Sequence, residues 1–159
     1  MFPTPAGLLG LEGEEGGLTR LYLPGQAGEP AGEETPLLAL GRVQLLEYFR
    51  GTRREFSLPL LPRGTPFFRQ VWAALGEVPY GQVTTYGALA RRVGRPRAVR
   101  AVGQANHRNP LPILIPCHRV VGADGGLTGY AGGLALKEFL LKLEGAWPAG
   151  PGTLEGKTQ

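Results

Sequence analysis

The sequence predicts an α+β fold with two lobes, a small N-terminal α/β lobe over residues 1–62 and a mostly helical C-terminal lobe over residues 63–145. Two observations support this division. Apolar residues near the N-terminus form short segments around a glycine-rich turn, whereas those after residue 63 recur at helical spacing behind capping residues. The segment LPRGTP, residues 61–66, is the expected linker, and residues 146–159 are expected to form a disordered tail.

Two short apolar segments predict a β-hairpin at the N-terminus. Residues 5–11 and 18–23 are separated by the turn sequence EGEEGG. Residues 54–60 alternate in part between apolar and polar side chains and are interpreted as a further strand. This lobe contains no His, no Cys and no cluster of paired carboxylates, so we expect no chemistry in it.

A helix is predicted between these strands. Thr35 can cap its N-terminus, and Pro36 suits the first helical position, where a missing N–H leaves no hydrogen bond unmade. Gly51 marks its end. The residues that give the helix a broad apolar side are Leu37, Leu38, Leu40, Val43, Leu45, Leu46, Tyr48 and Phe49.

The C-terminal lobe is expected to begin with three helices. The first follows Thr65, and the second follows Thr84 or Thr85 and stops at Gly94. The third is expected from Pro96 to about His107, so that a tight glycine-containing turn joins the last two. This is a helix-turn-helix pattern, which occurs in DNA-binding domains and, for packing reasons alone, in many other helical domains.

The third of these helices has a thin packing side and a polar side. A thin helix with long polar side chains can enter a groove of DNA, and the alternative is a surface helix packed closely on its neighbour. The packing side consists of Ala98, Val102 and Ala105. The polar side, spaced by three and four residues, consists of Arg97, Arg100, Gln104 and Arg108.

Basic side chains are concentrated in the C-terminal lobe. Residues 1–63 carry 6 basic and 8 acidic side chains, whereas residues 64–159 carry 11 basic and 5 acidic ones. Seven arginines and no acidic residue lie between Arg91 and Arg119. Such a stretch favours a polyanionic partner, with a solvated basic surface as the alternative. No membrane-spanning run and no secretion signal is visible, so a cytoplasmic location is expected.

The residues able to do chemistry gather around Cys117. It is the only cysteine, which excludes an internal disulfide, and with His107 and His118 it makes a set too small for a four-ligand zinc site. We therefore expect no metal or other cofactor. A lone buried cysteine is usually inert. Here, however, His118 and Arg119 follow directly, and cations beside a thiol lower its pKa.

The order of Cys117 and His118 raises a geometric question, because neighbours in a strand point to opposite faces. Either the chain bends between them or a water molecule bridges them. His118 also needs an acid to orient it, and the candidates are Asp124, Glu138 and Glu144. Glu144 is favoured. A carboxylate in the last turn of a helix interacts unfavourably with the helix dipole, and a residue kept at such a cost is a better candidate for a functional role than an ordinary surface glutamate.

Two tyrosines belong to the same part of the sequence. Tyr130 lies in the loop GADGGLTGYAGG, residues 122–133, which matches no phosphate-binding pattern and either lines a pocket or is a plain connection. Tyr86 opens the second helix of the lobe, where its phenol either meets a backbone phosphate or packs in the interior.

These segments resemble the O6-alkylguanine-DNA alkyltransferases, also called methylated-DNA–protein-cysteine methyltransferases. The resemblance covers about Thr65 to Glu144 and rests on motifs in the family's order: GQVTTYGALA (81–90), RAVGQAN (100–106), NPLPILIPCHRVV (109–121) and GGLALKEFLLKLEG (132–145). It implies a ribonuclease H-like N-terminal lobe and a winged-helix-like helix-turn-helix in the C-terminal lobe. Some relatives bind zinc in the N-terminal lobe, but this chain lacks the ligands.

The resemblance implies a role for each matching residue. Cys117 would accept the alkyl group, and His118 would act as a base through water, polarised by Glu144. Tyr86 would press on the phosphate 3′ to the target nucleotide and donate to the base, while Arg100 would fill the gap left by the flipped base. Further residues expected to contact DNA are Thr85, Arg97, Gln104 and Arg108. Those expected around the alkylguanine are Val120, Tyr130, Ala131, Asn106, which stands where some relatives have an apolar residue, and Asn109, which would brace the active-site turn.

A protein of this family repairs DNA by direct reversal of damage. It would bind double-stranded DNA in the minor groove as a monomer, turn O6-alkylguanine out of the helix and transfer the alkyl group irreversibly to Cys117, once per molecule. O4-alkylthymine is a second candidate substrate. The alternatives are a sensor that binds alkylated DNA without reacting and, in a different class, a Cys-His hydrolase.

Overall fold

The computed structural model describes residues 1–26 and 32–147, which form two compact units. The N-terminal unit consists of Met1–Arg63 together with Pro110–Leu114, and the C-terminal unit of Gly64–Asn109 together with the chain from Ile115 onward. The sequence interpretation did not foresee that Pro110–Leu114 joins the N-terminal unit. There, the backbone N–H of Leu21 donates to the carbonyl of Pro110 (2.8 Å).

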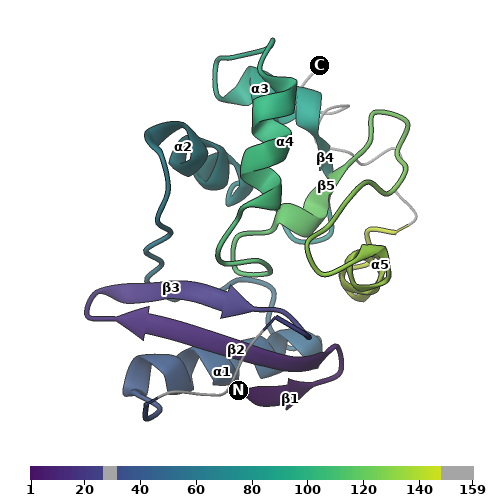
Figure 1. The fold of residues 1–159 in the computed structure, drawn as a ribbon. Coiled ribbons are helices and arrows are strands. Elements are labelled where there is room, and N and C mark those ends of the chain that lie inside the picture. The colour runs from purple at the N-terminus through teal and green to yellow at the C-terminus, as the bar shows by residue number, and fades with distance from the viewer. Residues whose placement is uncertain (27–31, 148–159) are drawn as a thin grey trace. The chain divides into compact units, whose positions relative to one another are not determined.

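Three antiparallel strands and one helix build the N-terminal unit (Figure 1). β2 (Gly7–Glu14) and β3 (Gly17–Tyr22) form the predicted hairpin, and β1 (Phe2–Thr4) adds a strand beside β2. α1 (Pro36–Phe49) packs on this sheet. It comes close to β2 at Gly41, where a Cβ atom would lie 2.9 Å from a methyl of Leu11, so a larger residue there would have to move the leucine side chain.

The predicted N-terminus of α1 is confirmed, because the Thr35 hydroxyl accepts a hydrogen bond from the first turn (3.2 Å). The strand predicted over residues 54–60 is wrong. Within this segment only Leu60 pairs, in a single parallel bridge with Leu18. Pro59 has no N–H to donate, and a proline at this place interrupts any longer ladder.

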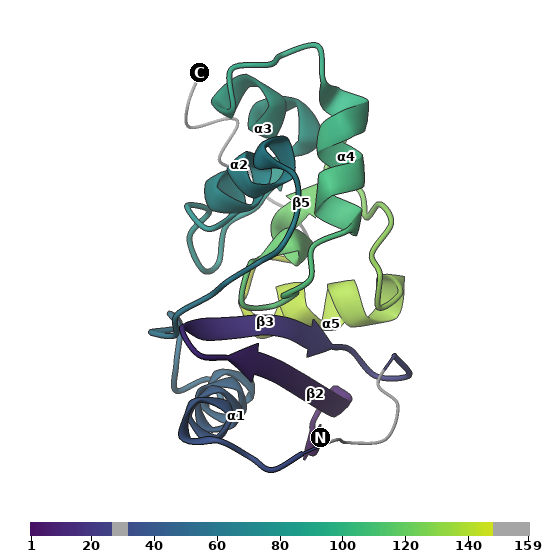
Figure 2. The ribbon, with the colours of Figure 1, turned by 60° about the vertical axis from the view of Figure 1, so that its left-hand side comes forward.

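The C-terminal unit contains a group of three helices, α2 (Pro66–Leu75), α3 (Tyr86–Arg92) and α4 (Val99–His107), which pack against one another (Figure 2). Thr65 caps α2 and Thr85 caps α3, each by accepting a hydrogen bond of 3.1 Å from the first turn, as the sequence predicts. The indole N–H of one α2 residue, Trp72, donates to the carbonyl of Ala105 (2.8 Å) and ties α2 to α4.

α4 begins later than predicted. The sequence places its start at Pro96, whereas the first helical residue is Val99. Ala98 stands in the cap position and makes no side-chain cap hydrogen bond, so the residues before it remain in a turn. Arg97 therefore lies in this turn and not on the helix face that carries Arg100.

A short parallel sheet connects the start of α3 with the segment that carries Cys117. β4 (Thr84–Thr85) pairs with β5 (Val120–Val121). Tyr86 follows β4 directly, and a turn of 3₁₀ helix, η1 (Cys117–Arg119), directly precedes β5. The pairing therefore joins two chain segments that are more than thirty residues apart in the sequence.

α5 (Leu134–Leu143) lies near η1 in the same unit. Phe139 is 38% exposed, although it is a large apolar residue. The buried positions of this region are Lys137, Leu140, Leu141 and Glu144, with intervals of three, one and three residues, which place Phe139 beside the buried stripe and not in it.

The chain after α5 corrects the expected limit of the tail. Ala146 is buried with Val83, Val121 and Leu141, and Trp147 packs against this cluster, so both residues belong to the packed structure. Residues 148–159, the rest of the expected tail, lie outside the described part of the chain. Within residues 1–26 and 32–147, no helix combines the length and apolarity needed to cross a bilayer.

Candidate active site around Cys117

Cys117 begins a 3₁₀ turn and not an extended strand. The chain therefore bends at Cys117 and His118, which was one of the two solutions that the sequence left open. Two buried amide side chains hold the bend. Asn109 Nδ2 donates to the carbonyl of Ile115 (2.8 Å), and Asn106 Nδ2 donates to the carbonyl of Cys117 itself (3.4 Å). Asn109 was expected to brace the active-site turn, and its hydrogen bond to Ile115 is a contact that can do so.

His118 is fully buried and pairs with Glu144, at 2.7 Å between Nε2 and Oε2. Glu144 is the C-terminal cap residue of α5, and of the three acids that the sequence offered it is the one that reaches the imidazole. Asp124 accepts a hydrogen bond from a loop N–H, and Glu138 pairs with Lys142, one turn away on α5.

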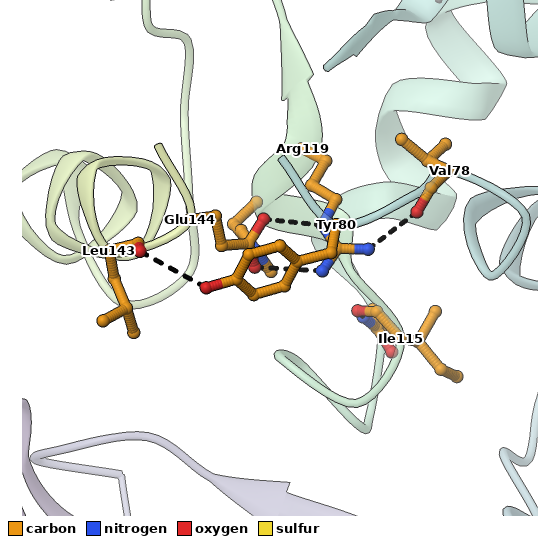
Figure 3. A network of polar contacts seen from close by, with 8 residues as sticks. Val78, Tyr80, Ile115, Arg119, Leu143 and Glu144 are labelled. Atoms are coloured by element: carbon orange, nitrogen blue, oxygen red, sulfur yellow. Dashed lines mark hydrogen bonds and ion pairs between the residues drawn. The ribbon is translucent and has the colours of Figure 1, made fainter. Parts of the chain in front are cut away.

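Arg119 holds the other side of the Glu144 carboxylate. Its Nε donates to Oε1 (2.8 Å) and its Nη2 to Oε2 (3.0 Å), while Nη1 donates to the carbonyl of Val78 (2.7 Å) (Figure 3). The guanidinium also lies over the ring of Tyr80, whose hydroxyl donates to the carbonyl of Leu143 at the end of α5. The carboxylate is therefore fixed in place from two directions.

These contacts set the charges of the buried pair. Burial acts to raise the pKa of Glu144, but His118 and Arg119 outweigh it and hold the pKa well below the ordinary range. Burial lowers the pKa of His118, and the neighbouring carboxylate offsets this only in part. At neutral pH the site therefore holds a carboxylate and a neutral imidazole. Because Nε2 faces a carboxylate, Nε2 carries the hydrogen and Nδ1 is left as the basic nitrogen.

The expectation that neighbouring cations lower the pKa of Cys117 is wrong for His118 and Arg119. The imidazole is neutral, and the guanidinium is engaged by Glu144 and Val78. Burial raises the pKa of the thiol to about 11, against the effects of a hydrogen bond from Asn109 and of the charge of Lys137. Cys117 is therefore a protonated thiol at rest, and it needs a base before it can act as a nucleophile.

Two residues of this site were not foreseen. Lys137 has no exposed surface, and burial lowers its pKa to about 8, so it remains mostly charged at pH 7. Its Nζ donates to the carbonyl of Thr128 (3.1 Å), whose hydroxyl lies 2.8 Å from the phenol oxygen of Tyr86. A signal for Lys137 was present: it precedes Leu140 by three residues and so occupies the apolar side of α5.

The residues expected around the alkylguanine differ in exposure. Tyr130 and Val120 are buried, whereas Ala131 is exposed. The hydroxyl of Tyr130 and Nδ1 of His118 are both buried, and neither has a hydrogen-bond partner within the described residues. These two unsatisfied polar atoms mark places where a bound polar group would be favoured.

The residues expected to contact DNA mostly remain at the surface. Arg97, Arg100, Gln104 and Arg108 are exposed, although only Arg100 and Gln104 lie within α4. Thr85 does not fit this expectation, because its side chain is buried and its hydroxyl caps α3. In the part of the chain that the structure describes, no three His, Cys, Asp or Glu side chains gather as a metal site would require.

Comparison with known proteins identifies the family. The family model described as 6-O-methylguanine DNA methyltransferase, DNA binding domain, matches residues 66–146. The chain is 49% identical over 150 residues to the constitutive methylated-DNA–protein-cysteine methyltransferase of Bacillus subtilis, with 89% of this chain and 91% of the relative covered. The chain belongs to the 6-O-methylguanine DNA methyltransferase family. Its function is DNA repair by transfer of an alkyl group from methylated DNA to a cysteine of the protein.

Further members of the family show the same extent of likeness. A methyltransferase of Methanosarcina acetivorans is 46% identical over 151 residues, with 92% of this chain and 97% of the relative covered. The crystal structure of Mycobacterium tuberculosis OGT in complex with DNA matches with a TM-score of 0.84 at 43% identity and covers 91% of each chain. The likeness therefore extends over both units, beyond the segment that the sequence motifs identified.

Proposed function

We propose that Cys117 is the alkyl acceptor and that His118 is the base that activates it, in a reaction that each molecule performs once. The observation that carries this assignment is a series of buried hydrogen bonds that links Arg119 to Glu144 and Glu144 to His118. His118 is the residue directly after the proposed nucleophile in the sequence. Burial keeps the imidazole neutral, the contact of Nε2 with Glu144 leaves Nδ1 as the proton acceptor, and a protonated Cys117 requires such an acceptor.

The proposed reaction begins with the proton of the Cys117 thiol passing through a water molecule to Nδ1 of His118. The thiolate attacks the alkyl carbon, a sulfur–carbon bond forms, and the bond between that carbon and guanine O6 breaks with its electron pair left on the guanine. Tyr86 donates a hydrogen bond to the departing base. The resulting thioether is not hydrolysed under these conditions, and the described part of the chain holds no second thiol, so the protein is consumed.

The target atom is hidden in duplex DNA, so the nucleotide has to leave the stack before it can react. We propose that α3 and α4 form a winged-helix-like helix-turn-helix, that α4 enters the minor groove, and that Arg100 takes the place of the extruded base. The exposure of Arg97, Arg100, Gln104 and Arg108, with the small buried residues Val102 and Ala105 behind them, supports this arrangement.

The remaining expectations join this proposal. The sheet and helix of residues 1–62 form the ribonuclease H-like lobe, Val120, Tyr130 and Ala131 surround the alkylguanine, and the protein acts as a monomer. A cytoplasmic location agrees with the reaction, which consumes a reduced thiol that a reducing compartment preserves. O6-alkylguanine is the proposed substrate, and O4-alkylthymine is the second one to test.

A mass measurement tests the assignment. The protein is incubated with a duplex oligonucleotide that contains one O6-methylguanine, digested, and analysed by mass spectrometry. We expect one additional methyl group on the peptide that contains Cys117 and none after incubation with undamaged duplex. Binding of the damaged duplex without any mass gain would instead indicate a sensor. Repeated turnover of an ester or amide by Cys117 would indicate a hydrolase.

A further inference from the structure

The phenol of Tyr86 has a hydrogen-bond partner outside its own helix. Its ring faces Gly103 of α4, where even an added Cβ atom would lie 3.9 Å from two ring carbons, so this side of the ring is not crowded. The phenol oxygen lies 2.8 Å from the hydroxyl oxygen of Thr128. The donor to the departing base in the proposed reaction therefore has a fixed hydrogen-bond partner from a segment about forty residues away.

Thr128 is itself held by Lys137 in the C-terminal unit. Lys137 Nζ donates to its carbonyl (3.1 Å) and lies 3.5 Å from its hydroxyl oxygen. Its methyl lies on the side of Gly122, where an added Cβ atom would come within 3.3 Å of that methyl. The side-chain hydroxyl is therefore placed between Lys137 and Tyr86.

The charge of Lys137 favours one direction of this hydrogen bond. An ammonium group has only donors, so it faces a lone pair of the Thr128 oxygen and turns the hydroxyl hydrogen away from itself. Either oxygen of the Thr128–Tyr86 pair can be the donor, and the ammonium group favours the arrangement in which the Thr128 hydrogen points to the phenol oxygen. A phenol that accepts this bond keeps its own O–H free to donate elsewhere, and its oxygen is stabilised if it gives up the proton.

We propose that Thr128 is a positioning residue for alkyl transfer: anchored by Lys137, it donates to the Tyr86 phenol and directs the phenol proton to the departing guanine. The inference rests on the proposed role of Tyr86. When the guanine leaves with the electron pair of the broken bond, the phenol proton moves toward it, and the Thr128 hydroxyl holds the negative charge on the phenol oxygen until solvent returns the proton.

The test compares single-turnover rate constants for methyl transfer from duplex DNA at saturating DNA. Thr128→Val removes the hydroxyl and keeps the shape, and we expect it to slow transfer about tenfold, the scale of one lost hydrogen bond in the transition state. Thr128→Ser should restore a rate within about twofold of the unchanged protein. The dissociation constant for undamaged duplex should stay the same in both variants. Thr52→Val is the matched control, since the Thr52 hydroxyl bonds only locally to Glu47 in the N-terminal unit.

A double-mutant cycle separates action through Tyr86 from a general structural effect. Tyr86→Phe alone should slow transfer about a hundredfold, as loss of an acid or donor does. In that background Thr128→Val should cost no more than about a further twofold. A full tenfold loss in both backgrounds would overturn the inference, and so would an unchanged rate in Thr128→Val.

The outcomes for the inference and for the proposed function can be told apart. If the unchanged protein gains no methyl group on Cys117, the proposed function is wrong. If Cys117 is methylated and Tyr86→Phe is slow while Thr128→Val is not, only the inference is wrong. Should the valine variant fail to fold, Thr128→Ser compared with Thr128→Ala isolates the same hydroxyl, and equal rates in that pair would refute the inference.

Discussion

The two units differ in the kind of side chain that they bury. Among the described residues, the N-terminal unit buries one polar side chain, Gln44, whereas the C-terminal unit buries eight. Four of the eight are ionisable: His118, Arg119, Lys137 and Glu144. The N-terminal unit is otherwise an apolar core of leucines and aromatic residues between one helix and one sheet.

The buried ionisable side chains of the C-terminal unit lower its stability relative to an apolar core. Buried charges lose hydration, and a paired one is seldom more favourable than an apolar residue of the same size. Titratable groups gather in the interior mainly where their shifted pKa values are used. The concentration of such groups around Cys117 therefore distinguishes the reacting unit from the supporting one, and the following predictions test that distinction, from the largest expected effect on alkyl transfer to the smallest.

Replacement of the nucleophile has the largest effect. Cys117→Ala should abolish methyl transfer completely, because no other thiol exists in the sequence, while binding of duplex DNA stays largely intact. The measurements are protein mass after incubation with methylated DNA and a binding titration by fluorescence anisotropy. Simultaneous loss of binding would show that Cys117 supports the fold instead, and would remove the contrast between the units.

Loss of the Glu144 charge comes next. Glu144→Gln leaves Arg119 buried without a counter-charge and His118 without its carboxylate, so we expect transfer to fall about a hundredfold and the free energy of unfolding to fall by about 3 kcal/mol. Urea denaturation and single-turnover kinetics measure the two. The control is Glu14→Gln, which removes an exposed pair with Arg63 in the N-terminal unit and should change little. Equal effects of the two variants would contradict the comparison.

Acid should act through His118. Its pKa is lowered below the ordinary 6.5, so the folded protein prefers the neutral ring and the unfolded chain takes up the proton first. The stabilisation is complete above about pH 6.5 and is lost as the pH falls from there through the lowered pKa of the folded protein. Transfer slows at the lower end of this range, because Nδ1 takes up a proton in the folded protein only around that lowered pKa. Rate and unfolding measurements from about pH 8 down to the pH at which the protein unfolds check this. His107→Gln, at the exposed end of α4, should leave both profiles unchanged, and a rate in the unchanged protein that stays flat until it unfolds would exclude His118 as the base.

The arginines of the two units should differ in their effect on DNA. Arg100→Ala should slow transfer from duplex about tenfold and reduce the slope of binding against salt concentration by about one, because one phosphate or groove contact is lost. Transfer from the free base should hardly change. Arg50→Ala, an exposed arginine after α1, is the matched control and should have no effect. A loss of the same size in both variants would indicate a general charge effect.

The smallest effect on transfer belongs to the one buried polar side chain of the N-terminal unit. Gln44 Nε2 donates to the Ser57 hydroxyl (2.9 Å), and Gln44 Oε1 accepts from the Ser57 N–H (3.0 Å). Gln44→Ala should lower the free energy of unfolding by about 2 kcal/mol and leave the transfer rate per folded molecule unchanged. A slowed rate in fully folded protein would show that the supporting unit takes part in the reaction.

Several parts of the fold were predictable because they depend on local rules. The caps Thr35, Thr65 and Thr85 and the hairpin of β2 and β3 follow from residue types at fixed spacing. The errors arose where a longer-range contact or a missing hydrogen bond decided the outcome. The strand over residues 54–60 failed at Pro59, and the start of α4 moved because Ala98 provides no cap.

The site divides in the same way. The motif around Cys117 predicted Cys117 as the nucleophile, His118 as the base and Glu144 as its acid partner, and the structure brings the last two into contact. The expectation that Arg119 lowers the pKa of the Cys117 thiol was wrong, because its guanidinium donates to the carboxylate of Glu144. The direction of a side chain from a 3₁₀ turn depends on the packing around the turn, which adjacency in the sequence does not convey.

The sequence by itself determined which residues could react, where α1, α2 and α3 begin, and which family the chain resembles, because these depend on residue identity and on spacing along the chain. Only the tertiary structure decided that the Cys117 thiol is protonated at rest, that Nδ1 of His118 is the basic nitrogen, and that Thr128, bound by Lys137, reaches Tyr86. Charge state and hydrogen-bond direction depend on burial and on neighbours in space, and those neighbours come from segments that folding brings together.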